Sequence, residues 1–150
     1  ALNEPVLFLS QFIDYSGDDG QYRKFRVVLI DGKPYACHMG VSSHWMIHYV
    51  NAGMYEAAAK RAEEAVFLNT FADFAERHKV ALDTIYQRSG LDYLGIDCAE
   101  TKDGQFLVFE IDPAMVIHAM DDEVLFPNKQ IHMSKVINAF RNLLLARVGH

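Results

Sequence analysis

Two Asp-Gly pairs constrain this chain most. Asp31-Gly32 and Asp103-Gly104 each separate two strand-like runs of mostly apolar residues. A two-residue Asp-Gly connection favours a tight β-hairpin, because both central positions of that turn need positive φ. The predicted strands of the two hairpins are Tyr22–Ile30, Lys33–Val41, Leu91–Glu100 and Gln105–Asp112.

Helical patterns fill most of the remaining chain. Tyr55–Lys79 is dominated by Ala, Glu, Lys and Arg, with apolar residues at helical spacing, so it predicts one long helix. Val80–Ser89 predicts a second helix, and Gly90 suits its C-terminal end. Ile131–Arg147 predicts a closing amphipathic helix.

Three segments complete the expected architecture. Val6–Ile13 is a continuous apolar run that predicts a buried strand. Asp14–Gln21 is polar with two glycines and predicts a loop, and Ser42–Met54 predicts an irregular connection with short helical turns. The order of elements indicates an α+β fold with a largely antiparallel sheet, and 150 residues suit a single domain.

Composition excludes several classes of function. The net charge of −6 argues against general nucleic-acid binding, which requires a basic surface. No apolar stretch approaches the roughly 18 residues that span a membrane, and the N-terminus shows no signal-peptide pattern. Cys37 and Cys98 lie far apart in apolar runs, which favours two reduced core thiols in a cytoplasmic protein over a disulfide.

The second hairpin brings acidic residues together. With a two-residue turn at Asp103-Gly104, the register places Glu100 opposite Leu107 and Asp97 opposite Glu110. Opposed residues point to the same side of a sheet.

Asp112 lies two residues beyond Glu110 and points the same way. Like charges placed opposite each other destabilise a sheet, whereas a divalent cation such as Mg²⁺ makes the arrangement favourable. The alternative is a solvated acidic face, against which the apolar neighbours on these strands argue.

These motifs resemble a known family. Leu91-Asp92-Tyr93-Leu94-Gly95-Ile96-Asp97, followed by Asp103-Gly104 and by Phe109-Glu110-Ile111-Asp112, resembles the terminal signature of the ATP-grasp superfamily. The resemblance implies that Asp97, Glu110 and Asp112 bind Mg²⁺ (or Mn²⁺) that bridges the phosphates of ATP.

Further segments extend the resemblance. Gln11, Phe12 and Ile13 look like the strand that ends near the adenine pocket. Tyr22–Val28 resembles the strand whose arginine reaches the phosphates, which makes Arg26 the catalytic candidate, with Lys24 where many relatives have an acidic residue.

The run His44–Met54 resembles a subgroup in which an ATP-grasp domain accompanies tetratricopeptide repeats. In relatives the equivalent region lines the acceptor substrate, which implies that role for His48, Asn51 and Gly53.

The resemblance implies an ATP-dependent carboxylate–amine or carboxylate–thiol ligase that acts through an acylphosphate. Residues 1–150 would be its C-terminal lobe, cut from a longer protein whose N-terminal lobe supplies the rest of the ATP site. We therefore expect this chain alone to be inactive, to bind ATP weakly, and to be capable of dimerising through an exposed apolar patch. The alternative is a nucleotide-binding or protein-interaction module that has lost catalysis.

Two basic residues have open interpretations. A register through Asp31-Gly32 places Arg26 opposite Cys37, and its guanidinium then pairs with Glu110 or Asp112, contacts phosphate, or does both. Lys129 follows Pro127-Asn128 and is interpreted as a solvated loop lysine.

Overall fold

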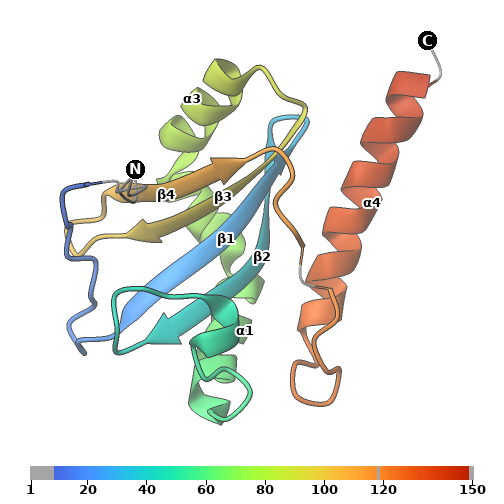
Figure 1. The fold of residues 1–150 in the computed structure, drawn as a ribbon. Helices are drawn as coiled ribbons and strands as arrows, with labels where there is room; N and C mark the ends of the chain where they lie inside the picture. Colours follow the sequence, from blue (N-terminus) through green and yellow to red (C-terminus); the bar gives the residue numbers. More distant parts are fainter. Residues whose placement is uncertain (1–8, 118, 149–150) are drawn as a thin grey trace, which may run out of the picture.

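The computed structural model describes residues 9–117 and 119–148. Four antiparallel strands form one sheet in the order β2-β1-β3-β4, flanked by four α-helices and one short 3-10 helix (Figure 1). This is the α+β fold expected from the sequence. The elements are β1 (Tyr22–Ile30), β2 (Lys33–Ser42), η1 (Tyr49–Asn51), α1 (Ala58–Asn69), α2 (Phe71–Arg77), α3 (Lys79–Ser89), β3 (Tyr93–Glu100), β4 (Phe106–Asp112) and α4 (Lys129–Val148).

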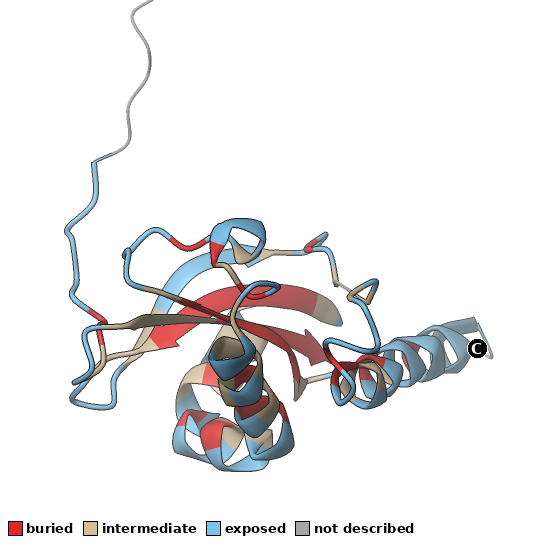
Figure 2. Cartoon of the chain, turned by 90° about the horizontal axis from the view of Figure 1, so that it is seen from below, coloured by how far each residue is buried: buried red, intermediate tan, exposed pale blue. Residues whose placement is uncertain are grey.

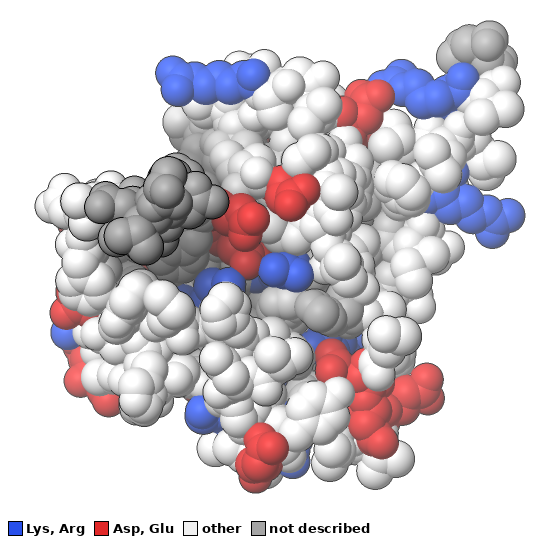
Figure 3. Space-filling view, in the orientation of Figure 1, with Lys and Arg blue, Asp and Glu red and all other residues white. Residues whose placement is uncertain are grey.

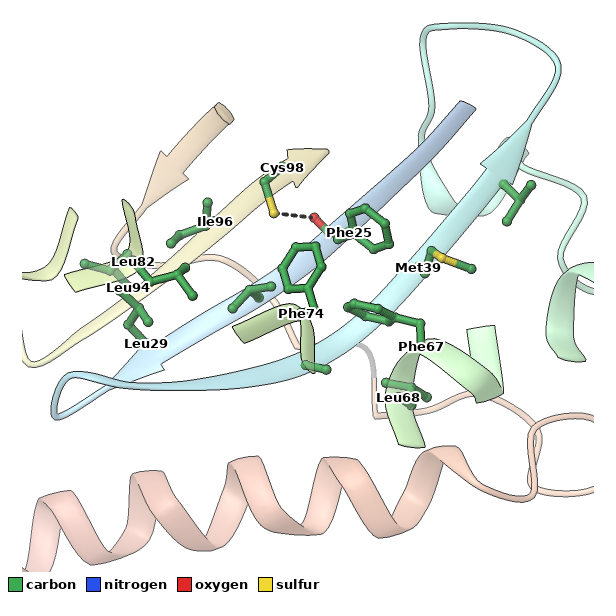
Figure 4. Close-up of a cluster of buried hydrophobic side chains, with 13 residues drawn as sticks. Phe25, Leu29, Met39, Phe67, Leu68, Phe74, Leu82, Leu94, Ile96 and Cys98 are labelled. Atoms are coloured by element: carbon green, nitrogen blue, oxygen red, sulfur yellow. Dashed lines mark hydrogen bonds between the residues drawn. The ribbon is translucent and has the colours of Figure 1, made fainter. Parts of the chain in front are cut away.

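One face of the sheet is closed by α1, α2 and α3. Phe25 of β1 stacks against Phe67 of α1 and Phe74 of α2, with ring centroids 4.7 and 5.0 Å away (Figure 4). Leu82 of α3 and Ile96 of β3 belong to the same buried cluster. Burial of large side chains on this scale is the main stabilising term for a domain of this size.

The opposite face is only partly covered. Helix α4 packs Met133, Val136 and Leu143 against Val28 and Ile30, which lie at one end of β1. Side chains alternate along a strand, so Lys24 and Arg26 share this face with Val28 but lie beyond the helix. Figure 2 shows α4 lying to the side of the sheet, so loop segments and not the helix cover the polar half of this face.

The first hairpin is confirmed, with one change of register. Asp31 and Gly32 have φ values of 51° and 74°, as a tight Asp-Gly turn requires. A bulge then shifts the pairing between Arg26 and Val27, so that Arg26 lies opposite His38. The expected pairing of Arg26 with Cys37 is therefore wrong, because a bulge adds one residue to β2 that no turn motif announces.

The second hairpin contains two deviations that cancel. Residues 101–105 connect the strands, so the connection is longer than two residues and Glu100 lies opposite Phe106 rather than Leu107. A bulge between Asp97 and Cys98 then shifts the register by one residue. Asp97 consequently lies opposite Glu110, as the sequence predicted.

Two other expectations are wrong. Tyr55–Lys79 was expected to form one helix, but the helix is interrupted at Thr70 and again at His78, giving α1 and α2 followed by α3. The Thr70 hydroxyl donates to the carbonyl of Val66 at 2.9 Å, a local bond that competes with helix continuation. Composition alone did not reveal the breaks, because neither position carries Gly or Pro.

The segment expected to form a buried strand at Val6–Ile13 is also different. Residues 9–13 are irregular, and Leu9, Phe12 and Ile13 are exposed. Residues 6–8 lie outside the described part of the chain.

Other expectations are confirmed. Helix α3 ends at Gly90, whose φ is 63°, and both cysteines are buried and free. Burial raises the pKa of the Cys37 thiol to about 12. None of the helices within residues 9–117 and 119–148 is long and apolar enough to cross a bilayer.

A buried ionic network fixes α4 to the rest of the fold. Lys129, at the start of α4, is 2% exposed and lies 3.1 Å from a carboxylate oxygen of Glu64 in α1. Its ammonium also donates to the Tyr49 hydroxyl at 2.6 Å and forms an ion pair with Asp121. Glu64 in turn accepts the backbone N–H of Met39 in β2 at 3.1 Å. Lys129 is thus a core residue and not a solvated loop lysine.

We expect Lys129→Met to destabilise the fold by about 3–5 kcal/mol, because it leaves two buried carboxylates without their cation. Urea denaturation would measure the change. Lys135→Met is the matched control on the exposed face of the same helix and should change stability by less than about 0.5 kcal/mol. Adding Glu64→Gln to Lys129→Met should recover part of the loss. Equal unfolding midpoints for Lys129→Met and Lys135→Met would refute this role.

Candidate functional site

A buried carboxylate lies at the centre of the open sheet face. Asp97 in β3 is 2% exposed and is bound by two cations from the neighbouring β1. Arg26 donates to it in a bidentate arrangement, from Nε to Oδ1 at 2.7 Å and from Nη2 to Oδ2 at 2.9 Å. Lys24 donates from Nζ to Oδ2 at 2.8 Å. Strand pairing produces this cluster, because Arg26 lies directly opposite Asp97 and Lys24 is two residues away on the same face.

Electrostatics keep Asp97 ionised. Burial by itself would raise the pKa of this carboxyl group, but the hydrogen bonds from Arg26 and Lys24 outweigh it and hold the pKa below its usual value. Burial would similarly lower the pKa of Arg26, and the bonds to Asp97 raise it instead. The cluster therefore contains two cations and one buried anion at neutral pH.

Two more carboxylates border this cluster. Glu110 in β4 pairs directly with Asp97 and is exposed, and Asp112 is partly exposed beyond it. Figure 3 shows acidic side chains next to basic ones near the middle of this face. Asp112 accepts the backbone N–H of Ala114 at 2.6 Å through Oδ1, which turns the chain back over the sheet.

The segment that follows β4 borders the cluster on one side. The carbonyl of Val116 accepts a bond from Arg26 Nη1 at 3.0 Å, and the carbonyl of Met115 accepts one from the Tyr93 hydroxyl at 3.1 Å. Gly95 permits this crossing, because a Cβ atom there would lie 2.4 Å from the Cβ of Met115. The crossing fixes the orientation of Arg26.

An apolar cavity of about 550 Å³ lies against β4. Gln11, Phe12 and Ile13 line it on one side, and Phe109 of β4 and Trp45 line it on others. Its size falls within the range of small-molecule pockets. The structure therefore brings the three residues proposed for adenine to a cavity, although their backbone is not a strand.

A smaller cavity of about 160 Å³ has Lys24 and His48 in its wall. It shares three lining residues, Tyr15, Trp45 and Phe109, with the larger cavity. Of the residues proposed for the acceptor substrate, His48 therefore reaches a cavity next to the cluster.

The other two proposed acceptor residues lie outside the lining of the smaller cavity. Asn51 accepts the backbone N–H of His48 at 3.0 Å. Gly53 has a φ of 66°, so its conformation accounts for a glycine there.

The carboxylates fit a magnesium ion in part. Within residues 9–117 and 119–148, no three His, Cys, Asp or Glu side chains converge closely enough to hold a metal ion. Asp97 forms ion pairs with Lys24 and Arg26, whereas Glu110 is exposed to solvent and Asp112 is partly exposed. Mg²⁺ commonly takes one or two carboxylates and completes its shell with water and phosphate. Glu110 and Asp112 suit that pattern, and the assignment of all three acids stays a prediction.

Sequence reasoning missed three residues of this region. Lys24 was treated only as a departure from a family pattern, although a lysine two residues from Arg26 on a strand must share its face. Tyr15 is buried, and its hydroxyl donates to the carbonyl of Trp45. Burial raises the pKa of Tyr15 to about 12. Trp45 and Tyr15 lie in predicted loops, where spacing gives no signal for a shared cavity.

We expect Asp97→Asn to destabilise the protein by about 3–5 kcal/mol near neutral pH, because two largely buried cations lose their anion. The pKa of Asp97 is lowered in the folded state, so its contribution is fully present above the unfolded pKa of about 3.9 and is lost as the pH falls through the folded pKa. Urea unfolding at about pH 7 and about pH 3 should show the difference from wild type shrinking at the lower pH.

Glu110→Gln is the matched control, since it removes the exposed carboxylate opposite Asp97. Its stability should stay within about 0.5 kcal/mol of wild type. A penalty for Asp97→Asn no larger than that for Glu110→Gln would contradict the proposed burial of charge.

Comparisons with known proteins do not place this chain in a family. No protein-family model matches it, and no curated protein matches it significantly. One solved structure, the macrocyclase MdnB from Microcystis aeruginosa MRC, overlaps 73% of this chain and 34% of its own, at 18% identity and a TM-score of 0.29. The chain thus spans about a third of that structure's length. A TM-score this low carries no argument about fold or activity, so function has to be argued from the site itself.

Proposed function

We propose that this chain forms the ATP- and Mg²⁺-binding wall of an ATP-dependent ligase that joins a carboxylate to an amine or a thiol. The observation that carries the proposal is that three kinds of feature lie close together on one sheet face. An apolar cavity at Gln11–Ile13 and Phe109 shares lining residues with a smaller cavity that has Lys24 in its wall, Lys24 and Arg26 bind Asp97, and the exposed Glu110 pairs with Asp97, with Asp112 beyond it. A nucleotide presents matching features, with an apolar base, anionic phosphates and a phosphate-bound cation.

Each part of the face would have a distinct task. The cavity would hold the base through contacts with aromatic rings, because Phe12 and Trp45 pack edge-to-face with centroids 5.8 Å apart at its wall. Arg26 is fixed by Asp97 and by Val116, so its guanidinium would offer a phosphate positive charge in a preset position. Glu110 and Asp112 would hold Mg²⁺, which when bound would neutralise phosphate charge.

The reaction that suits such a surface is phosphoryl transfer to a carboxylate. The terminal phosphate of ATP moves to the substrate carboxylate, giving an acylphosphate and ADP. An amine or thiol then attacks the acyl carbon and releases phosphate. The protein contributes mainly position and charge, and the Lys24–Asp97–Arg26 cluster supplies fixed positive charge without any rearrangement.

A binding module without catalysis is the second candidate. It is favoured by one observation, namely that Asp97 is occupied by two cations and not available to a metal ion in this arrangement. The candidates separate on whether the chain joined to a preceding lobe releases ADP from Mg²⁺-ATP when given carboxylates and amines. Release of ADP that depends on both substrates supports the ligase, and nucleotide binding without release supports the module.

The metal part of the proposal predicts a Mg²⁺-dependent gain in ATP affinity. The chain has a single tryptophan, Trp45, at the wall of both cavities, so its fluorescence reports nucleotide binding. Glu110→Gln combined with Asp112→Asn should remove most of the Mg²⁺-dependent gain, by about tenfold or more, because the ion loses both carboxylates. Binding in EDTA should change little.

Asp83→Asn, on the far side of the sheet in α3, serves as the control for charge removal. An ATP affinity that is the same with Mg²⁺ as with EDTA in the wild-type chain would rule out the proposed metal site.

A further inference from the structure

Lys24 has capacity for a ligand that the fold does not use. Its side chain is 16% exposed and lines the 160 Å³ cavity. An ammonium group carries three N–H donors. Asp97 Oδ2 accepts one of them at 2.8 Å, and within residues 9–117 and 119–148 no second acceptor bonds to Lys24.

Positive charge is in excess at the buried Asp97 carboxylate itself, with the exposed Glu110 and the partly exposed Asp112 at the border of the cluster. Asp97 has one negative charge and is bound by two positive side chains, Lys24 and Arg26. The bidentate contact with Arg26 already neutralises the charge of Asp97, so the positive charge of the Lys24 ammonium is in excess there. A largely desolvated cation is costly unless it is paired, and Glu110 is exposed to water on the outer strand.

The position of Lys24 selects the type of anion. The smaller cavity shares Tyr15, Trp45 and Phe109 with the larger cavity proposed for the base. Lys24 also touches Asp97, which pairs with Glu110 in the proposed metal site. A chain of phosphates that extends from the base through the smaller cavity would meet Lys24.

We propose that Lys24 binds a phosphate oxygen of the nucleotide, with Asp97 as the positioning residue that holds the ammonium at the wall of the smaller cavity. This inference rests on the proposed nucleotide-binding function. It adds a contact that needs no metal ion, since lysine acts as a point charge towards phosphate. Lysine can keep its aliphatic stem on apolar surface and offer the ammonium to a ligand, and Lys24 lines a cavity whose other lining residues are largely aromatic or apolar.

The test compares ligands with and without phosphate in the presence of EDTA. Trp45 fluorescence or calorimetry would give the affinities of ADP, adenosine, inorganic pyrophosphate and acetate for the wild-type chain and for Lys24→Met. We expect Lys24→Met to weaken ADP and pyrophosphate by about tenfold, the loss typical of one charge-assisted hydrogen bond. Adenosine should bind both proteins equally.

Two further variants separate a ligand contact from a structural role. Lys24→Arg keeps the charge and should retain most of the ADP affinity. Lys33→Met removes an exposed lysine at the far end of the same hairpin and should change none of the affinities. Unfolding midpoints of all variants would identify any loss of fold, and Lys24→Met should fold because Arg26 still pairs with Asp97.

The remaining outcomes are also decisive. Equal losses of ADP and adenosine with Lys24→Met would make Lys24 a wall residue and overturn the inference. Weaker binding of acetate, with unchanged binding of pyrophosphate, would assign Lys24 to a substrate carboxylate and likewise overturn it. If wild type binds pyrophosphate through Lys24 but binds neither ADP nor adenosine better, the anion contact stands and the nucleotide function fails.

Discussion

The buried charge of Asp97 organises the open half of this sheet. A carboxylate in the middle of a packed sheet is stable only when cations replace its lost hydration, and Arg26 and Lys24 do so from the adjacent strand. Their side chains are drawn inward by that contact, and they cannot extend into solvent as surface lysines and arginines do. The fold therefore holds positive charge in a fixed position, which is what recognition of a phosphate requires.

The two faces of the sheet have separate roles. The helices α1, α2 and α3 bury the first face in an apolar core that includes Phe25, Phe67 and Phe74. Helix α4 covers one end of the second face and is fixed there by Lys129 and Glu64. The half of this face that carries Asp97 lies beyond α4, and there Lys24 lines the smaller cavity together with Trp45 and Phe109.

Both hairpins contain a bulge close to this cluster. One lies at Arg26 and Val27 in the pairing of β1 with β2, and the other at Asp97 and Cys98 in the pairing of β3 with β4. A bulge increases local twist and redirects side chains. The second bulge also aligns Asp97 with Glu110, since the longer connection at residues 101–105 would otherwise have offset them by one. The irregularities thus coincide with the residues that form the candidate site.

The α+β class, the four strands of the sheet and the tight turn at Asp31-Gly32 follow from the sequence alone, because turn residues and apolar periodicity act over a few positions. The pairing of Asp97 with Glu110 was also predicted, but from a two-residue turn, and the structure reaches it through a longer connection and a bulge. Three features depend on tertiary packing: Asp97 binds Lys24 and Arg26, Lys129 is buried, and Gln11–Ile13 and Trp45 line one cavity. These contacts join residues far apart in the chain, so they depend on how helices and strands pack and not on any local spacing.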